Sequence, residues 1–389
     1  MFRIGIIGIG NMGTVHLKNI VSGNVKDAVL TAVCDIDKEK FLKVKDILSE
    51  DVLFFDNHTD LINSGKVDGV LIATPHYDHP VIAIDAFNAG LHVFCEKPAG
   101  VYTKNVREMN EAAEKSKKSF QMNFVLRTNG AFQKIKEMLD NKELGDIKRI
   151  TWIITNWYRS QVYFNSGGWR ATWAGEGGGT LLNQNPHQLD LLYWFFGLPK
   201  RLLAACYFGK NRDIEVEDEA TSYMEYPSGM VGMYATSVSE FPGTNRLEIA
   251  GDMGKLVFED NKITFFKNEV SEKEFNKRMD SPFGPIPLEV IDVPFDVTEL
   301  NDCQALMVSN WVDSAQNGAK LICPGTEGIK SLLMSNAMYL SSWNENKWID
   351  IPFDEDEFHG KLLKKIETST YKKETVKDCE LDMNSSFTK

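Results

Sequence analysis

Two side chains of this 389-residue sequence are of the types that move protons in enzymes, and they stand at positions suited to catalysis. Lys97 is the centre of a Glu-Lys-Pro sequence that directly follows a short apolar run. His187 follows a proline at the start of an apolar helix pattern, and Asp190 stands three residues further on, where a carboxylate could orient the imidazole and raise its pKa. These residues suggest acid/base chemistry. A surface lysine before a turn, and a capping histidine beside a helix-dipole aspartate, are the structural alternatives.

A glycine-rich turn near the N-terminus predicts the element that positions a cofactor. Gly8-Ile9-Gly10-Asn11-Met12-Gly13 has the Gly-x-Gly-x-x-Gly spacing and joins an apolar run at 3–9 to a helix pattern at 12–21. In such turns the first glycine permits a tight bend, the second admits a pyrophosphate, and the third allows close helix packing. A turn that is glycine-rich for steric reasons alone is the alternative.

Asp35 supports the cofactor interpretation and indicates which dinucleotide binds. It ends a second apolar run at 29–34, roughly 20 residues after the last glycine of the motif. Its carboxylate can accept hydrogen bonds from both ribose hydroxyls and would repel a 2′-phosphate. Because no arginine follows within the next few residues, we expect NAD rather than NADP.

Further apolar runs at 52–55, 69–73, 92–95 and 120–124 alternate with helix patterns, which predicts a doubly wound parallel sheet over residues 1–123. Ligands bind beyond the carboxyl ends of such strands. We therefore assign to the cofactor site the residues of the glycine motif and Asp35, together with Thr74, Pro75, His76, His79, Glu96 and Lys97. Because His76 and His79 lack a supporting carboxylate or cysteine, we predict no metal.

From residue 124 to 389 the pattern changes to long alternating runs, as in the segment from Ile150 to Thr155. Pro227-Ser228-Gly229 separates two such runs and predicts a hairpin. We expect an α+β domain with a large, mostly antiparallel open sheet and helices near 301–315 and 329–343. Trp152 and Ile153 show that both sheet faces are apolar, so we expect helices on one face and a second subunit on the other. The polar tail after Thr368 should be peripheral.

The segment from Trp152 to Trp173 is rich in aromatic and arginine side chains. Aromatic rings suit the C–H faces of a sugar or cyclitol, while arginine and tyrosine hydrogen-bond its hydroxyls. We predict that Tyr158, Trp169 and Arg170 bind substrate; that these rings belong to the core or a subunit interface is the alternative.

Taken together, these motifs resemble the glucose-fructose oxidoreductase, inositol dehydrogenase and rhizopine-catabolism (Gfo/Idh/MocA) family. The residues that carry the resemblance are Gly8, Gly10, Gly13, Asp35, Thr74-Pro75, Glu96-Lys97-Pro98, Gly177-Gly178-Gly179, His187 and Asp190. The resemblance implies that Lys97 touches cofactor and substrate hydroxyl, that His187 is the acid/base, and that the Lys97–Pro98 bond is cis. It implies NAD-dependent oxidation of a secondary alcohol on a sugar, sugar derivative or cyclitol, by a homodimer or homotetramer assembled through the C-terminal sheet.

The sequence departs from this family at Asn183, where many members have aspartate, and at Asn185, where many have glycine. Asn183 can bind a substrate hydroxyl but cannot accept its proton, so Lys97 and His187 remain the catalytic candidates. Two other functions stay open: a dinucleotide-binding regulator without turnover, and glycosidic-bond cleavage through a transient ketone with tightly held NAD.

Composition excludes several classes of partner. A net charge of -12 and a pI near 5.2 argue against binding nucleic acid or an anionic membrane through bulk electrostatics. The six cysteines are scattered and form no C-x-x-C pair, which is typical of reduced thiols in the cytoplasm. We find no signal peptide and no run of 18 apolar residues, and we expect a cytoplasmic protein.

Overall fold

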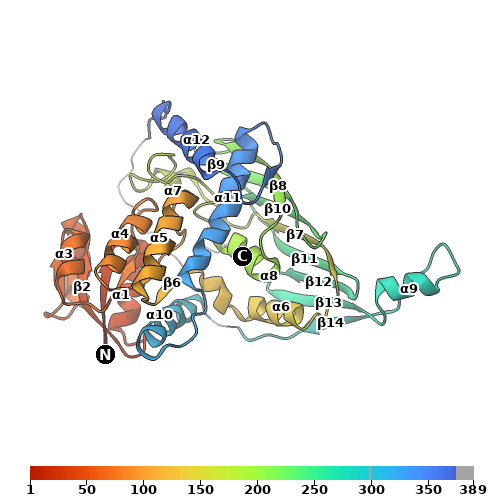
Figure 1. Cartoon of the computed structure of the whole chain (residues 1–389), viewed down its shortest axis with the longest axis horizontal. Helices are drawn as coiled ribbons and strands as arrows, with labels where there is room; N and C mark the ends of the chain where they lie inside the picture. The colour runs from red at the N-terminus through yellow and green to blue at the C-terminus, as the bar shows by residue number, and fades with distance from the viewer. Residues whose placement is uncertain (298, 374–389) are drawn as a thin grey trace.

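The computed structural model describes residues 1–297 and 299–373. Its N-terminal part contains a six-stranded parallel sheet with the strand order β3-β2-β1-β4-β5-β6 (Figure 1). Its strands are β1 (Phe2–Ile7), β2 (Ala28–Cys34), β3 (Leu53–Phe55), β4 (Gly69–Ile72), β5 (His92–Cys95) and β6 (Phe120–Met122). Its helices are α1 (Asn11–Val21), α2 (Lys38–Val44), α3 (His58–Asn63), α4 (Asp78–Asn88) and α5 (Thr103–Ser116), with the short 3₁₀ turn η1 (Lys45–Ile47). The predicted doubly wound sheet is confirmed.

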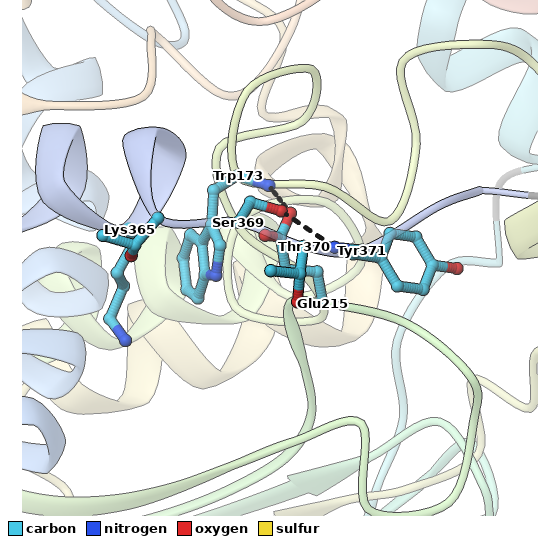
Figure 2. A pocket seen from close by; sticks show the side chains of 7 residues that line it. Trp173, Glu215, Lys365, Ser369, Thr370 and Tyr371 are labelled. Atoms are coloured by element: carbon cyan, nitrogen blue, oxygen red, sulfur yellow. Dashed lines mark hydrogen bonds between the residues drawn. The ribbon is translucent and has the colours of Figure 1, made fainter.

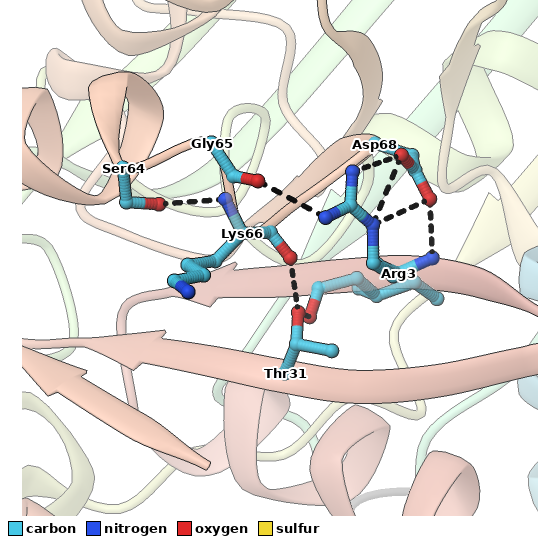
Figure 3. A network of polar contacts seen from close by, with 7 residues as sticks. Arg3, Thr31, Ser64, Gly65, Lys66 and Asp68 are labelled. Carbon is cyan, nitrogen blue, oxygen red and sulfur yellow. Dashed lines mark hydrogen bonds and ion pairs between the residues drawn. The ribbon is translucent and has the colours of Figure 1, made fainter. Parts of the chain in front are cut away.

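The strand order reverses between β1 and β4, so the loops after these two strands diverge and leave a crevice for a ligand at the carboxyl edge. The opposite edge is tied together by polar contacts (Figure 3). Arg3 pairs with Asp68 at 2.7 Å, and the Thr31 hydroxyl donates to the Lys66 carbonyl at 2.9 Å. These bonds hold β1, β2 and the start of β4 in register and leave the carboxyl edge for the site.

The second sheet has nine strands in the order β14-β13-β12-β11-β7-β10-β9-β8-β15. Its strands are β7 (Ile147–Ile154), β8 (Arg201–Phe208), β9 (Glu217–Glu225), β10 (Val231–Ser237), β11 (Asn245–Gly251), β12 (Gly254–Glu259), β13 (Lys262–Asn268), β14 (Leu288–Val293) and β15 (Ile349–Asp350). All its neighbouring strands are antiparallel except β7 and β10. The predicted hairpin joins β9 and β10, and β14 forms one edge of the sheet.

Helices cover one face of the second sheet and separate it from the first domain (Figure 1). The helical elements of this part are η2 (Val125–Thr128), α6 (Gly130–Asp140), α7 (Gln161–Asn165), α8 (Pro186–Phe196), α9 (Glu272–Arg278), α10 (Leu300–Asn317), η3 (Gly325–Glu327), α11 (Gly328–Trp343) and α12 (Glu355–Glu367). Of these, α11 packs on both β8 and α8. It is buried along most of its length because apolar side chains lie on all its sides.

The helix α10 packs on the first sheet although it comes late in the chain. The Trp311 ring lies edge-on to Phe2 at 5.3 Å, and the Gln121 side chain donates to the Met307 carbonyl at 2.6 Å. The division at residue 123 stays a prediction, and α10 belongs by its contacts to the first sheet. No helix in the described residues is long and apolar enough to cross a membrane.

Candidate active site

The glycine motif forms a tight turn between β1 and α1. Gly8 has φ of +96°, and a Cβ there would lie 2.6 Å from the Ala73 carbonyl oxygen, so only glycine fits. A Cβ on Gly13 would collide with the Gly8 carbonyl, whereas one on Gly10 would meet no atom within 4 Å. The chain is therefore open beside Gly10, where Asn11 and Met12 begin α1 without a side-chain cap. Such a turn fits a pyrophosphate held by the free N–H groups of the helix.

Asp35 lies directly beside this turn. One carboxylate oxygen accepts the Ile9 N–H at 2.7 Å, and the other accepts the Asp37 N–H at 2.9 Å. The carboxylate is buried and oriented by backbone groups, and it keeps lone pairs for ribose hydroxyls. The Lys40 ammonium lies 3.4 Å from the same carboxylate, so a cation neighbours Asp35 although no arginine follows it closely in the sequence.

The loop after β4 connects the cofactor site to the second domain. The His76 Nδ1 atom lies 3.0 Å from the Glu176 carbonyl oxygen, and the Tyr77 hydroxyl donates to the Trp173 carbonyl at 2.6 Å. Burial and the nearby charges of His79 and Lys97 lower the pKa of His76, which keeps the ring neutral. The loop therefore anchors the aromatic segment of the second domain over the carboxyl edge of β4.

His79 holds two loops together. Its Nδ1 atom lies 2.7 Å from the Pro98 carbonyl oxygen, and its Nε2 atom lies 2.9 Å from the Thr74 carbonyl oxygen. Because both nitrogens face backbone and the ring is buried, His79 supports the loops of Thr74-Pro75 and of the Glu-Lys-Pro sequence. A direct contact of His76, His79, Thr74 or Pro75 with the cofactor stays a prediction.

Glu96 is buried beneath the site and fully engaged. Its carboxylate lies 2.7 Å from His16 Nε2 and accepts the Asn123 side-chain amide at 2.6 Å. Burial by itself raises the pKa of Glu96. The hydrogen bond and charge of His16, together with Lys97 and Asn123, outweigh this effect and lower the pKa to about 2. Glu96 is therefore an anion that anchors the loop of Lys97, a role that does not require it to touch the cofactor.

Lys97 and Asn183 meet across the two domains. The Lys97 Nζ atom donates to the Asn183 carbonyl oxygen at 2.7 Å and lies 3.5 Å from the Asn183 side-chain oxygen. Burial, together with the positive charges of Arg170 and Arg159, lowers the pKa of Lys97 to about 8 against the opposing effect of Glu96 and Glu176. Lys97 therefore changes its charge near neutral pH. The Lys97–Pro98 peptide bond is cis, as predicted.

His187 lies on the first turn of α8 beside Phe124, with 6.1 Å between the ring centroids. The helix begins at Pro186 as predicted. The Nδ1 atom of His187 is buried and has no hydrogen-bond partner among the described residues. Burial and the charge of Lys97 lower the pKa of His187 to about 3, so its ring is neutral and one ring nitrogen carries no proton.

The prediction that Asp190 orients His187 and raises its pKa is wrong. Asp190 forms a buried bidentate pair with Arg127, with distances of 2.7 and 2.8 Å, and Glu327 pairs with another nitrogen of Arg127 at 2.7 Å. Residues three apart on a helix can share a face, but the guanidinium is a stronger partner for a buried carboxylate than an imidazole is. Asp190 therefore stabilises the packing of α8.

Glu176 is a site residue that the sequence did not reveal. It is fully buried, accepts the Ala171 N–H at 2.6 Å, and accepts a hydrogen bond from the Asn183 side-chain amide. Burial raises the pKa of Glu176 despite the opposing charge of Arg170. Asn183 thus connects Lys97 to the buried carboxylate of Glu176.

Glu217 holds the triple-glycine turn that leads to Asn183. Its carboxylate accepts the Gly179 N–H at 2.8 Å, the Leu181 N–H at 2.7 Å and the Tyr339 hydroxyl at 2.8 Å. Burial raises the pKa of Glu217 to about 7 against these hydrogen bonds. Glu217 was not predicted either, because only the fold brings β9 and α11 to this turn.

The aromatic segment divides into residues near Lys97 and residues apart from it. Trp169 lies edge-on to His76 at 5.0 Å, and the Arg170 guanidinium lies over the Trp169 ring at 4.4 Å. Tyr158 packs against Phe241 and Arg212 instead. The structure thus brings Trp169 and Arg170 towards the predicted cofactor loops, while Tyr158 stays on a separate part of the segment.

The described start of the C-terminal tail, residues 369–373, lies along this segment and is not merely peripheral. The Tyr371 hydroxyl donates to the Asp213 carbonyl at 2.7 Å, and the Lys373 ammonium donates to the carbonyl oxygens of Gly167 and Arg170. Figure 2 shows Ser369 to Tyr371 beside Trp173 and Glu215, where they line a pocket of about 360 Å³. This pocket contains none of the predicted site residues. The rest of the tail lies outside the described residues.

Two family models match the chain and together cover more than half of it. Residues 2–124 match the oxidoreductase family with an NAD-binding Rossmann fold, and residues 132–257 match the GFO/IDH/MocA C-terminal domain. Among characterised proteins, the Myo-inositol 2-dehydrogenase of Thermotoga maritima is 28% identical over 67% of this chain and 75% of its own length. The rhizopine catabolism protein MocA of Rhizobium meliloti is 29% identical over 50% of this chain and 57% of its own.

Solved structures are similar over almost the whole chain. The WlbA dehydrogenase from Chromobacterium violaceum, in complex with NADH and UDP-GlcNAcA, has a TM-score of 0.75 and 26% identity and covers 91% of this chain and 96% of that chain. A levoglucosan dehydrogenase in complex with NADH and levoglucosan has a TM-score of 0.74 and covers 90% of this chain and 99% of that chain. At 19% identity, this second structure shows the shared fold alone.

Proposed function

Because the chain belongs to the Gfo/Idh/MocA family of NAD-binding oxidoreductases, we propose that it oxidises a secondary alcohol of a sugar, a sugar derivative or a cyclitol with NAD. The observation that carries the proposal is the contact of Lys97 with Asn183 at the carboxyl edge of the first sheet, on the turn that leads to His187. These groups come from both domains and converge beside the turn that fits a dinucleotide.

The residues divide the chemistry between them. NAD, when bound, supplies the hydride acceptor. The neutral imidazole of His187 takes the hydroxyl proton, and Nζ of Lys97 holds the same oxygen in place of the Asn183 carbonyl and stabilises its developing charge. The Asn183 amide binds a neighbouring hydroxyl, while Glu176 orients that amide. The carboxylate of Asp35 selects NAD through the ribose hydroxyls.

A panel of sugars and cyclitols with NAD and the purified protein tests the proposal through NADH fluorescence and product analysis. We expect net NADH with at least one polyol and a loss of turnover in His187→Ala. Bond cleavage without net NADH would indicate the lyase-like use of NAD. Binding of NAD with no conversion of any compound would indicate a regulator. Either result, cleavage without net NADH or binding without conversion, would contradict the proposal.

We also propose that the outer face of the second sheet joins subunits in a homodimer or homotetramer. Ile153, Tyr207 and Met233 lie on this face and are 38%, 43% and 41% exposed, although apolar side chains of their size are usually covered. Five cysteines among the described residues are free and buried, which supports a reducing compartment such as the cytoplasm. Analytical ultracentrifugation decides the oligomeric state.

A further inference from the structure

The Arg170 guanidinium contacts two aromatic rings. Its centre lies 4.4 Å from the centroid of Trp169 and 4.5 Å from that of Tyr163, and its Nη1 atom donates to the Tyr163 hydroxyl at 2.8 Å. Cation–π contacts orient an arginine without neutralising it. A guanidinium has five N–H donors, so most of its donors remain available to a ligand.

No carboxylate among the described residues lies within 4.0 Å of this guanidinium, although the chain is strongly acidic. Arginines of the second sheet behave differently: Arg149, Arg201 and Arg246 each pair with a glutamate. Glu176 is close enough for the charge of Arg170 to lower its pKa, but its two oxygens accept the Ala171 N–H and the Asn183 amide. Arg170 therefore has no direct ion-pair partner among the described residues, whereas most arginines of this protein have one.

A short chain of contacts connects Arg170 to the catalytic lysine. The Tyr163 hydroxyl accepts hydrogen bonds from Arg170 and, at 3.0 Å, from the Gln184 side-chain amide. Gln184 follows Asn183, whose backbone carbonyl accepts a hydrogen bond from Lys97. The Gln184 side-chain oxygen is buried and has no partner among the described residues. The charges of Arg170 and Arg159 also contribute to the low pKa of Lys97, as expected of groups around one site.

We propose that Arg170 binds an anionic group of the substrate, a carboxylate or a phosphate, on the same sugar or cyclitol whose alcohol is oxidised between Lys97 and His187. The inference rests on the proposed function and narrows its substrate class to acidic or phosphorylated polyols. A planar guanidinium can present parallel N–H groups to two oxygens of such an anion. A neutral polyol offers only hydroxyls and leaves this charge without a partner.

The test uses matched sets of substrates, each an aldose with its uronic acid and its 6-phosphate. NADH formation from each substrate is measured for the wild type, Arg170→Gln and Arg170→Lys. Arg278→Gln is the control, because Arg278 is exposed on α9 and its loss removes the same charge far from the site. We expect the wild type and the control to prefer an acidic member over its neutral parent. The ratio of their kcat/KM values should fall about 10- to 100-fold in Arg170→Gln and less in Arg170→Lys. Preference for the uronate or for the 6-phosphate identifies the anion.

A second measurement separates this inference from the proposed function. Thermal unfolding with NADH present reports binding of the same compounds without turnover. If an acidic compound stabilises the wild type but not Arg170→Gln, the anion site is supported even where no NADH forms. In that case only the redox proposal fails. A preference for neutral parents, an acidic preference that survives in Arg170→Gln, or neither turnover nor stabilisation by any acidic compound would overturn the anion site.

Discussion

Replacing Asn183 with aspartate should raise the pKa of Lys97, because it places a carboxylate where the Asn183 side-chain oxygen lies, 3.5 Å from the lysine Nζ atom. At that separation an effective dielectric constant of about 20 to 40 gives an attraction of roughly 2–5 kcal/mol. Desolvation of the new carboxylate opposes this attraction, and about 1–3 pKa units should remain. The pKa of Lys97 should rise from about 8 to about 9–11.

Glu176 determines whether the new charge persists. It contacts the side chain of residue 183, and burial has already raised its pKa, so it should take up a proton when a second carboxylate appears beside it. The pair then carries one negative charge, as Glu176 alone does in the wild type, but that charge now lies on residue 183, 3.5 Å from Lys97 Nζ. In the double variant with Glu176→Gln, the effect of Asp at position 183 on Lys97 should persist.

The pKa of Lys97 is measured without a substrate, from the pH dependence of its acylation by a small reagent, followed by mass spectrometry of the peptide. Asn346→Asp is the control, because Asn346 is exposed and this substitution introduces an aspartate elsewhere on the protein. A pKa of Lys97 that stays the same or falls in Asn183→Asp would refute the electrostatic reasoning and the geometry of the pair.

Four further predictions follow from the site. His187→Ala should lower kcat about 10²–10⁴-fold and leave NAD affinity unchanged in a fluorescence titration. The control His58→Ala, which removes a partly exposed imidazole paired with Asp85, should behave as wild type, and equal loss in both variants would contradict the role of His187. Asp35→Ala should lower the NAD over NADP ratio of kcat/KM about 5- to 150-fold, and an unchanged ratio would overturn its role in selecting NAD. Alcohol oxidation should rise with pH through about 8, because the amine form of Lys97 still donates an N–H to the reacting oxygen but no longer adds a positive charge that opposes proton transfer to His187. Ketone reduction should fall over the same range, and a flat pH profile would contradict this reasoning. Asp190→Asn should lower the free energy of unfolding by about 3 kcal/mol in urea denaturation, at the low end for a broken buried pair because Glu327 still pairs with Arg127. A change in the pKa of His187 instead would indicate that Asp190 orients His187 after all.

The sequence by itself determined the features that depend on local spacing. The glycine turn, Asp35 after the second strand and the Pro-Ser-Gly hairpin each lie within a short stretch, where backbone conformation and hydrophobic period are encoded by neighbouring residues. The family resemblance, the NAD cofactor and the two kinds of sheet are confirmed, because they follow from such stretches and their order. The roles of Lys97 and His187 and the substrate contacts stay predictions.

Only the tertiary structure decided which buried polar groups pair with one another. Asp190 stands three residues from His187 but binds Arg127, which is 63 residues away, and Glu217 binds the turn of Gly179 from a different strand. A buried carboxylate must find charged or N–H partners, and those partners are set by which elements the fold brings together. For the same reason, Glu176 beside Asn183 and the lack of an ion-pair partner for Arg170 among the described residues could be seen only once the domains were assembled.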